Sequence, residues 1–326
     1  MDDLEFRLLN DFQRGFPLCF EPFHEIARRC GTDPAIVIEV YRSLAARGAL
    51  SRIGAVFAPN CVGASTLAAM RVPDARLADV AHCVSAYAEV NHNYEREHEW
   101  NLWFVVTTPD SARLAEVLSD IEHECGLTVM SLPLERDFHI DLGFDLGSGT
   151  VPVRGSRVVA VPCKLDAPQA ALVAALQAGF PLVARPYARL ARRVGTTELE
   201  AITQLERWVE AGIIRRFGVI VRHHELGFAA NAMVVLDVPD AEVEPTARRL
   251  ATERDITLCY QRPRRLPHWR YNLFCMIHGR ARDAVLAQIE EVLAHSAAAG
   301  YPRDILFSRR RFKQRGAQYV EKVVHE

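Results

Sequence analysis

Hydrophobic positions along this chain follow two kinds of spacing, and the same order of spacings occurs twice. In one segment, Ile36, Val40 and Leu44 lie four positions apart, as on one face of an α-helix. Gly48 after that segment, and Gly212 after a second similar one, favour the end of a helix. The pattern predicts helices over residues 3–14, 22–30, 33–47, 166–178, 186–194 and 197–211.

After each set of three helices, strand patterns alternate with helical ones. The first half has strands at STLAAMRV, YAEVNHNYE, EWNLWFVVTT and LTVMSLPLERDFHI, with helices at ARLADVAHCVSAY and SARLAEVLSDIEHEC. The second half has strands at AANAMVVLDV, DITLCYQRP, WRYNLFCMIHG and RDILFSRRRFKQRG, with helices at AEVEPTARRLATER and ARDAVLAQIEEVLAHS. Each half therefore predicts a ferredoxin-like βαββαβ unit.

The two halves also share residues. The segment GFPLCFEPFHEIARRCGTDPAIVIEVYRSLAARGALSRIGAVF (15–57) aligns without a gap with GFPLVARPYARLARRVGTTELEAITQLERWVEAGIIRRFGVIV (179–221). This repetition indicates an internal duplication. Each copy reads as three helices followed by a hairpin, the outline of a winged helix-turn-helix domain.

The predicted fold is α+β, a tandem repeat of a winged helix-turn-helix domain and a ferredoxin-like domain. We expect the first pair at residues 1–58 and 59–146, and the second at 164–222 and 223–326. A linker rich in Gly and Ser is expected at 147–163.

Composition places the chain among ordinary globular proteins. With 326 residues, 49% hydrophobic and 25% charged, it is long enough for two or more domains. No apolar run approaches the roughly 18 residues of a membrane span, and the acidic, amphipathic start MDDLEFRLLNDF is unlike a signal peptide. The expectation is a cytoplasmic protein with no membrane partner. Its eight scattered cysteines, without a CxxC pair, are expected to be reduced core thiols.

The small net charge of −2 conceals two oppositely charged halves. Residues 1–150 contain 12 Lys and Arg against 23 Asp and Glu, whereas the remainder contains 27 against 18. Such halves should attract each other, and an anionic ligand should rely on the second half.

Titratable side chains crowd the segment HNYEREHEWNLWF (92–104). If it stays extended, His92, Tyr94, Arg96 and His98 share one face, and the glutamates between them point to the other. One face would then serve ligand and proton transfer, and the other solvent or a partner. An ordinary charged hairpin turn is the competing interpretation.

The second copy repeats part of this motif. Tyr260 and Arg262 match the tyrosine and arginine of the first copy, but five additional residues precede the matching Asn272. Leu258 stands where the first copy has its first histidine, and His268 is only approximately in register with the second. The two halves are therefore not expected to do identical work.

Winged helix-turn-helix domains followed by ferredoxin-like domains resemble the Lrp/AsnC transcription regulators. The motifs HNYEREHEWNLWFVV, CYQRPRRLPHWRYNLFCMIHG, RRFGVIVRHHELGF and DFHIDLGFDL resemble those of siroheme decarboxylases, specifically of a fused NirD–NirL type in heme d1 biosynthesis. The resemblance covers nearly the whole chain. It implies removal of the C12 and C18 acetate carboxyl groups of siroheme, giving 12,18-didecarboxysiroheme, at a site between the two copies.

Acetate decarboxylation on an electron-rich pyrrole needs an acid and base near neutral pH, which favours histidine. No cofactor is expected beyond the iron of the substrate tetrapyrrole. We expect His98 and His268 to handle protons, with His92 as a third such residue or as an axial ligand to that iron. A loop histidine without chemistry is the competing interpretation of His268.

Arginines bind carboxylates through two hydrogen bonds, so the basic segments QRPRRLP and SRRRFKQRG are candidate substrate clamps. A solvated basic tail is the competing interpretation. His139, the pair His223 and His224, and the repeated Arg52 and Arg216 are weaker candidates. Substrate binding is expected from Tyr94, Arg96, Tyr260, Arg262, Arg264, Arg265, Arg310, Arg311 and Lys313.

A ligand-sensing, DNA-binding regulator is the main alternative function, and a tetrapyrrole carrier is another. The third helix of each copy argues against DNA, because Asp33 and Glu198 would bring carboxylates toward phosphates. We therefore expect no nucleic acid partner. An intrachain pseudo-dimer of the two ferredoxin-like domains is expected, and a further homodimer stays open.

Overall fold

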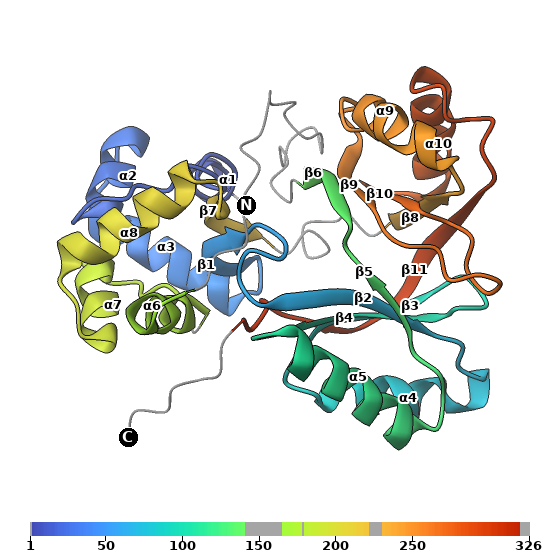
Figure 1. Ribbon diagram of the computed structural model, residues 1–326. Coiled ribbons are helices and arrows are strands. Elements are labelled where there is room, and N and C mark those ends of the chain that lie inside the picture. Colours follow the sequence, from blue (N-terminus) through green and yellow to red (C-terminus); the bar gives the residue numbers. More distant parts are fainter. Residues whose placement is uncertain (1, 141–164, 178, 222–229, 320–326) are drawn as a thin grey trace. The chain divides into compact units, whose positions relative to one another are not determined.

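The computed structural model describes residues 2–140, 165–177, 179–221 and 230–319, which form two compact units (Figure 1). The helical unit comprises residues 1–62, 155–226 and 319–326, and the sheet unit comprises residues 63–154 and 227–318. Each unit contains material from both copies of the repeat. None of the described helices is long and apolar enough to cross a bilayer.

Local signals fix the helices of the helical unit. Asp2 caps the first helix by accepting the N–H of Glu5, and Gly31 ends the second with a left-handed φ of 70°. The first copy contains α1 (Asp3–Asn10), α2 (Pro22–Cys30), α3 (Pro34–Ala46) and β1 (Leu50–Phe57). The second contains α6 (Ala167–Gln177), α7 (Pro186–Val194), α8 (Glu198–Glu210) and β7 (Ile214–Val221).

The strand of each winged domain pairs with its counterpart in the other copy. β1 and β7 run antiparallel, with Gly54 opposite Gly218 at the centre. Within the described residues, the hairpin expected in each copy is therefore wrong, because each strand takes its partner from the other copy. Phe16 and Phe180 meet edge to face at 5.5 Å between ring centroids, so equivalent residues of the two copies form a shared core.

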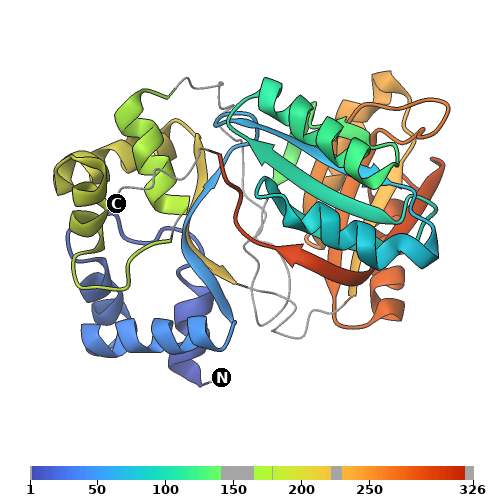
Figure 2. The ribbon, with the colours of Figure 1, turned by 90° about the horizontal axis from the view of Figure 1, so that it is seen from below.

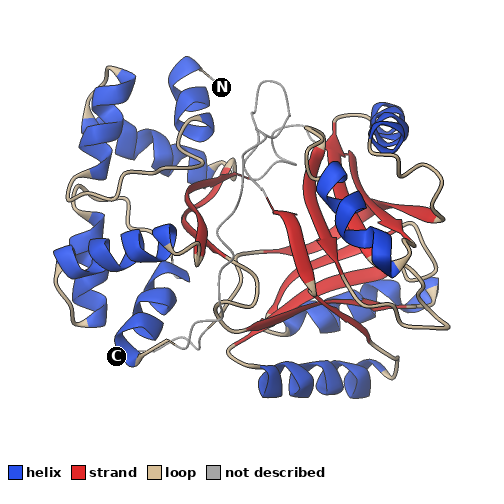
Figure 3. Ribbon diagram, turned by 45° about the horizontal axis from the view of Figure 1, so that its top comes forward, coloured by secondary structure: helices blue, strands red, loops and turns tan. Residues whose placement is uncertain are grey.

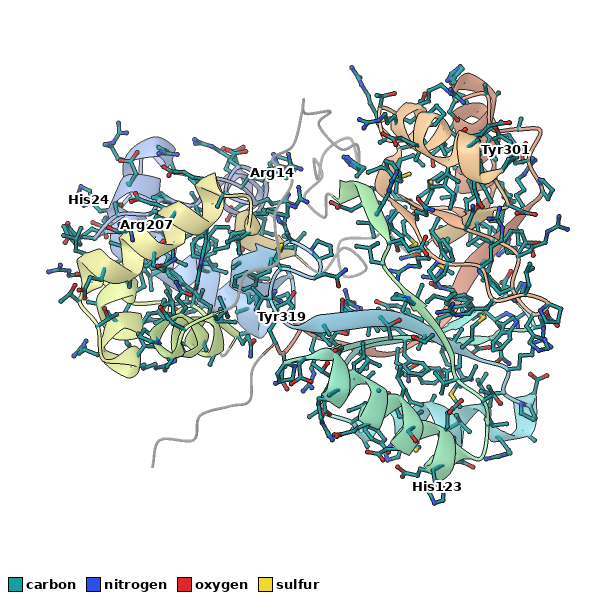
Figure 4. All side chains as sticks on the ribbon, viewed as in Figure 1. Arg14, His24, His123, Arg207, Tyr301 and Tyr319 are labelled. Atoms are coloured by element: carbon teal, nitrogen blue, oxygen red, sulfur yellow. The ribbon has the colours of Figure 1, made fainter. Side chains whose placement is uncertain are left out.

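Tyr319, which lies beyond the last strand, belongs to this helical unit. The ring of Tyr319 packs edge to face on Phe57 of β1, with centroids 5.3 Å apart (Figure 4). Its backbone N–H donates to the side chain of Gln177 at 2.7 Å.

In the sheet unit, both copies build one continuous nine-stranded sheet. Its order is β5-β2-β4-β3-β11-β8-β10-β9-β6. The first half contributes β2 (Ala64–Met70), η1 (Asp74–Arg76), α4 (Leu77–Ala86), β3 (Val90–Arg96), β4 (Leu102–Thr108), α5 (Ser111–Cys125), β5 (Met130–Pro133) and β6 (Arg136–Ile140). The second half contributes β8 (Ala230–Leu236), α9 (Asp240–Leu250), β9 (Ile256–Gln261), β10 (Leu273–Gly279), α10 (Arg282–His295) and β11 (Arg303–Gln314).

Each half contributes a strand segment that pairs with a strand of the other half. The start of β11 pairs with β8 of its own half, and its end pairs with β3 of the first half. In the same way, β5 pairs with β2 of its own half, and β6 pairs with β9 of the second half. The expected pseudo-dimer is therefore present within the sheet unit of one chain.

Opposite charges accompany this exchange at the β3–β11 junction. The Arg310 guanidinium donates to the Glu95 carboxylate at 2.8 Å, and Arg282 pairs with Glu97 at 2.8 Å. The glutamate face of the HNYEREH segment thus meets arginines of the basic half. Half-exposed pairs of this kind each contribute little to stability, on the order of 1 kcal/mol or less, but they favour one partner.

The two halves of the sheet carry their helices on the outer face, and their inner faces pack against each other (Figures 2 and 3). One apolar core lies under α4 and α5, and a second lies under α9 and α10. A third core contains inward side chains from both halves, among them Trp103, Tyr260, Trp269 and Phe274. This inner core is where the two copies can present chemistry to one ligand.

Candidate functional site

Two tyrosine–arginine pairs of equivalent sequence position lie on the inner side of the sheet unit. Tyr94 and Arg96 are on β3. Tyr260 is the penultimate residue of β9, and Arg262 directly follows that strand. The two arginines make equivalent backbone bonds, since the N–H of Arg96 donates to Asn101 and that of Arg262 donates to Asn272. The duplication therefore places one cation in each half of the inner core.

Arg96 is only 7% exposed. Its guanidinium donates to the carbonyl of Leu306 on β11 at 2.9 Å and lies over the Tyr94 ring, 6.0 Å from its centroid. Burial lowers the pKa of Arg96 to about 10, and the neighbouring Tyr260 and Tyr94 act in the opposite direction. The side chain remains a cation at neutral pH, although it has left water.

Arg262 repeats this arrangement in the second half. Its guanidinium donates to the carbonyl of Leu132 on β5 and lies 4.6 Å from the centroid of the Tyr260 ring. Burial lowers the pKa of this arginine too. Leu132 pairs with β2 of its own half and Leu306 pairs with β8 of its own half, so the two guanidinium groups follow the pseudo-symmetry.

These two buried cations lack the partners that buried charges ordinarily have. Among the residues that the structure describes, no carboxylate lies within ion-pair distance of Arg96 or Arg262. The Nε of Arg262 and the indole N–H groups of Trp100 and Trp269 are buried without an acceptor there as well. Burying a charge or a hydrogen-bond donor costs free energy unless it is paired. The inner wall that these arginines and tryptophans form is therefore suited to an anionic ligand with many acceptor atoms.

His92 and Tyr94 lie next to each other on the accessible part of β3. Both are half-buried, and their rings stack with centroids 6.3 Å apart and an angle of 15°. Burial raises the pKa of Tyr94, which therefore keeps its proton at neutral pH. Their placement agrees with the expected common face. The equivalent of His92 on β9 is Leu258, so only one half offers an imidazole here.

His98 does not continue that face, because β3 ends at Arg96 and the next four residues form a bend. Its Nδ1 accepts the N–H of Trp100 at 2.9 Å, and its Nε2 lies 3.4 Å from a carboxylate oxygen of Asp304. Tyr271 donates its O–H to the same carboxylate at 2.6 Å. The expectation of four residues on one extended strand is therefore wrong in its last member.

His268 lies in the five-residue insertion and is exposed. Its backbone N–H donates to the carbonyl of Arg265 at 2.9 Å, within a turn closed by the Arg265–Trp269 bridge. The next residue, Trp269, packs edge to face on His98 with centroids 5.5 Å apart. The two histidines proposed as a pair thus lie on either side of Trp269, and the structure shows no direct bond between them.

Two of the candidate clamps in the QRPRRLP segment hold the protein itself. Arg264 pairs with Asp237 at 2.9 Å and also with Asp240, next to the start of α9. Arg265 donates to the backbone carbonyl of Ser131 at 2.9 Å and is exposed. A ligand carboxylate at Arg264 would have to compete with two carboxylates of the chain.

The candidates on β11 also have internal partners. Arg310 is paired with Glu95, and exposed Arg311 donates to the side chain of Gln314 at 3.1 Å. Lys313 donates to two carbonyl oxygens at the C-terminal end of α4, at 2.5 and 2.7 Å. Burial, with Arg315 nearby, lowers the pKa of Lys313 to about 8. Lys313 is placed as a helix cap rather than on the inner face.

The weaker candidates are distributed elsewhere. His139 on β6 pairs with Cys259, a residue of the core under α9 and α10. His223 and His224 lie outside the described residues. Arg216 in the helical unit is buried, and burial lowers its pKa to about 9.

One polar cluster was not identified from the sequence. His278, the penultimate residue of β10, lies 3.0 Å from the Asn231 amide on β8 and 3.0 Å from the Thr257 hydroxyl on β9. Burial, followed by the charge of the nearby Arg96, lowers the pKa of this histidine. The signal was the histidine in NLFCMIHG, which the matching first-half strand NLWFVVTT lacks.

Two surface hollows among the described residues lie outside the inner core. One is lined by Arg189, Arg192 and Arg193 of α7, and the other lies beside β6 and α9. Within the part of the chain that the structure describes, no three His, Cys, Asp or Glu side chains gather as metal ligands.

Comparisons with known proteins agree with this architecture. A family described as "Siroheme decarboxylase NirDL-like HTH domain" matches residues 5–50 and 169–215, and the "AsnC-like ligand binding domain" matches residues 62–139 and 225–313. The predicted tandem α+β fold is confirmed.

Full-length relatives extend the match. The siroheme decarboxylase NirDL subunit of Paracoccus denitrificans is 46% identical over 325 residues, covering 98% of each chain. A crystal structure of the siroheme decarboxylase NirDL has a TM-score of 0.72 at 27% identity, covering 98% of this chain and 95% of that one. Its co-complex with an iron-uroporphyrin III analogue has a TM-score of 0.71, at the same identity and coverage. The chain belongs to the NirDL type of the siroheme decarboxylase family.

Proposed function

We propose that this protein decarboxylates siroheme, removing the C12 and C18 acetate carboxyl groups to give 12,18-didecarboxysiroheme on the way to heme d1. The observation that carries the proposal is the pair of buried guanidinium groups, Arg96 and Arg262, without carboxylate partners among the described residues. They lie against an aromatic inner wall, as a flat, polyanionic macrocycle requires. Relatives of the same length are named siroheme decarboxylases, which supports this substrate.

Each decarboxylation is balanced by one proton. The ring carbon accepts a proton, the bond between the acetate methylene and its carboxyl carbon breaks, and CO₂ leaves. The electron pair of that bond stays with the macrocycle, and proton rearrangement leaves a methyl group. No electrons are gained or lost, so the protein needs no cofactor beyond the substrate's own iron.

Histidines are the proposed proton carriers. His98 is proposed to pass protons, and Asp304, whose carboxylate lies 3.4 Å from its Nε2, is placed to orient the ring. His268 on the exposed turn is proposed to exchange protons with solvent. His92 stacks on Tyr94 at the accessible end of β3 and is proposed as a third carrier or as an axial ligand to the substrate iron.

Carboxylate recognition is assigned first to Arg96 and Arg262, with their tyrosines. A buried, charge-assisted hydrogen bond contributes roughly 1.5–3 kcal/mol, and a bidentate pair adds orientation. Arg265 and Arg311 are exposed and can reach carboxylates at the rim. Roles for Arg264, Arg310 and Lys313 would require exchange of their present partners.

We do not propose DNA recognition. The carboxylates at the start of each third helix are used as caps: Asp33 accepts the N–H of Ala35, and Glu200 forms a capping box with Thr197. Glu198 accepts the N–H of Ala188 at 3.1 Å. These side chains stabilise the helices and place negative charge where a reading helix needs donors.

The test is anaerobic incubation of the purified protein with siroheme, followed by mass spectrometry of the tetrapyrrole. Two successive losses of CO₂ are expected. Arg96→Met should weaken siroheme binding by at least 10-fold, whereas Arg71→Met, at an exposed arginine stacked on Trp100, should not. Unchanged siroheme in the presence of folded wild-type protein would reject the proposal.

A further inference from the structure

A row of polar side chains crosses the sheet next to Arg96. Arg96 on β3 stands opposite Ser308 on β11, and Asn231 on β8 stands opposite His278 on β10. Ser308 is one residue beyond Phe307, whose partner is Ala232, so the row continues from β11 to Asn231. The Ser308 hydroxyl and the Asn231 amide oxygen are buried without a hydrogen-bond partner in the described part of the chain. The middle of the row therefore contains polar atoms to which a ligand can hydrogen-bond.

Hydrogen bonds hold the His278 ring in one state. The Thr257 hydroxyl donates to the carbonyl of Met276 at 3.0 Å, so its oxygen is left to accept the Nδ1–H of His278. The Asn231 amide then donates to Nε2. Burial, followed by the positive charge of Arg96, lowers the pKa of His278 to about 4. The imidazole is neutral at pH 7, with a fixed tautomer.

The duplicated half supplies an internal comparison. Aligning NLWFVVTT with NLFCMIHG places Thr107 at the position of His278. Thr107 stands opposite Ser65 on β2, as His278 stands opposite Asn231 on β8. The Ser65–Thr107 pair thus repeats the strand pairing of Asn231 and His278 without an imidazole. We call the surroundings of Arg96, with His92 and His278, the Arg96 half of the site, and the equivalent surroundings of Arg262 the Arg262 half. The Arg262 half has Leu258 in place of His92 and Thr107 in place of His278, so it lacks both imidazoles.

We propose that the Arg96 half is the single place of decarboxylation, that His278 delivers the proton there, and that both carboxyl groups leave from it in turn. The Arg262 half then holds carboxylates without chemistry. This inference rests on the proposed function. It implies that the tetrapyrrole turns or rebinds between the two losses of CO₂, so that each acetate reaches the same imidazole.

Substrate binding itself would prepare His278. A carboxylate paired with Arg96 cancels the charge that disfavours the imidazolium, and the remaining carboxylates of the macrocycle favour it. His278 then takes a proton that originates in solvent and gives it to the ring carbon as CO₂ leaves. Each loss of CO₂ consumes one proton, and His278 returns to its neutral state.

The experiment compares His278→Thr, which copies the other half, with Thr107→Val as the matched control. Both are incubated anaerobically with siroheme, and the remaining, singly and doubly decarboxylated tetrapyrroles are quantified by mass spectrometry. His278→Thr should slow both losses by about 100-fold or more, with siroheme binding retained by absorbance titration. Thr107→Val should keep both rates. His278→Gln can still hydrogen-bond to its neighbours but cannot take up and deliver a proton, so its rates should match those of His278→Thr. It keeps the test decisive if His278→Thr does not fold.

Accumulation of singly decarboxylated product by His278→Thr, with the first loss at the wild-type rate, would show two separate reactive places and overturn the inference. Unchanged rates for both losses would overturn it too, while leaving the proposed function intact. An inactive wild-type protein would instead reject the proposed function.

Discussion

The half-buried His278 makes a prediction about stability that needs no substrate. In the unfolded chain a histidine has its ordinary pKa of 6.5, whereas in the folded protein the pKa of His278 is lowered to about 4. As pH falls through 6.5, the unfolded state takes up a proton that the folded state refuses. Stability is therefore complete above about pH 6.5, is lost as pH falls toward 4, and changes no further from this group below that.

The size of the effect follows from these two values. At about pH 5 the difference amounts to a loss of about 2 kcal/mol in the free energy of unfolding, and at about pH 7.5 it is close to zero. In His278→Gln this contribution is absent, while the other titrating groups are unchanged. The wild-type protein should therefore lose about 2 kcal/mol more than the variant between these two pH values.

Urea unfolding followed by tryptophan fluorescence measures this difference. Three of the four tryptophans, Trp100, Trp103 and Trp269, lie in the sheet unit with His278, so the signal reports the relevant unit. Equal losses in wild-type protein and His278→Gln would refute the reasoning. They would show that the folded protein accepts the proton as readily as the unfolded chain, and that the ring is not held neutral.

Three further predictions follow. Gly218→Ala should lower the free energy of unfolding by about 2–3 kcal/mol in urea titrations, because its Cβ would lie 2.4 and 2.5 Å from two backbone carbonyl oxygens after α1. Gly54→Ala, with nothing nearer than 3.7 Å, should change it by less than about 1 kcal/mol, and equal effects would contradict this packing. Lys313→Met should destabilise by about 1–2 kcal/mol through loss of the α4 cap while siroheme affinity, measured by absorbance titration, is kept; a large loss of affinity would make it a clamp instead. Asp304→Asn should slow siroheme turnover about 10-fold by removing the carboxylate that faces His98, with binding unchanged, and an unchanged rate would remove His98 from the proton path.

The helices were well predicted because the residues that begin and end a helix act only on their neighbours in the sequence. The helices at 22–30 and 186–194 were predicted with the bounds that the structure shows, since Pro22 and Gly31 act on neighbouring residues only. The order of strands in both ferredoxin-like halves was also readable, because alternation and helical spacing differ in period.

Pairing between the copies could not be predicted in the same way. A strand that is duplicated has the same pattern in both copies, so the sequence does not say whether β1 forms its own hairpin or pairs with β7. The swap of β6 and the end of β11 has the same origin. Only the charge asymmetry pointed to it, and Glu95 with Arg310 is one of its consequences.

The sequence predicted which residue types lie at the candidate site better than it predicted where each side chain lies in the structure. The shared Tyr-x-Arg motif led to the two buried arginines. His98 was placed on a strand that in fact ends before it, and Lys313 was expected at a substrate although it closes a helix. His278 was missed because one histidine at the end of an apolar strand has no pattern of its own. Its meaning comes from Asn231 and Thr257, which lie on two other strands.

The central claim is that the inner wall of the sheet unit binds the macrocycle through the buried guanidinium groups of Arg96 and Arg262. A crystal structure of this protein with bound siroheme tests that claim most directly. The account predicts a substrate carboxylate in a bidentate pair with Arg96, and the edge of the ring next to His278. A macrocycle held instead by the arginines of α7, with Arg96 still bonded only to the backbone, would contradict it.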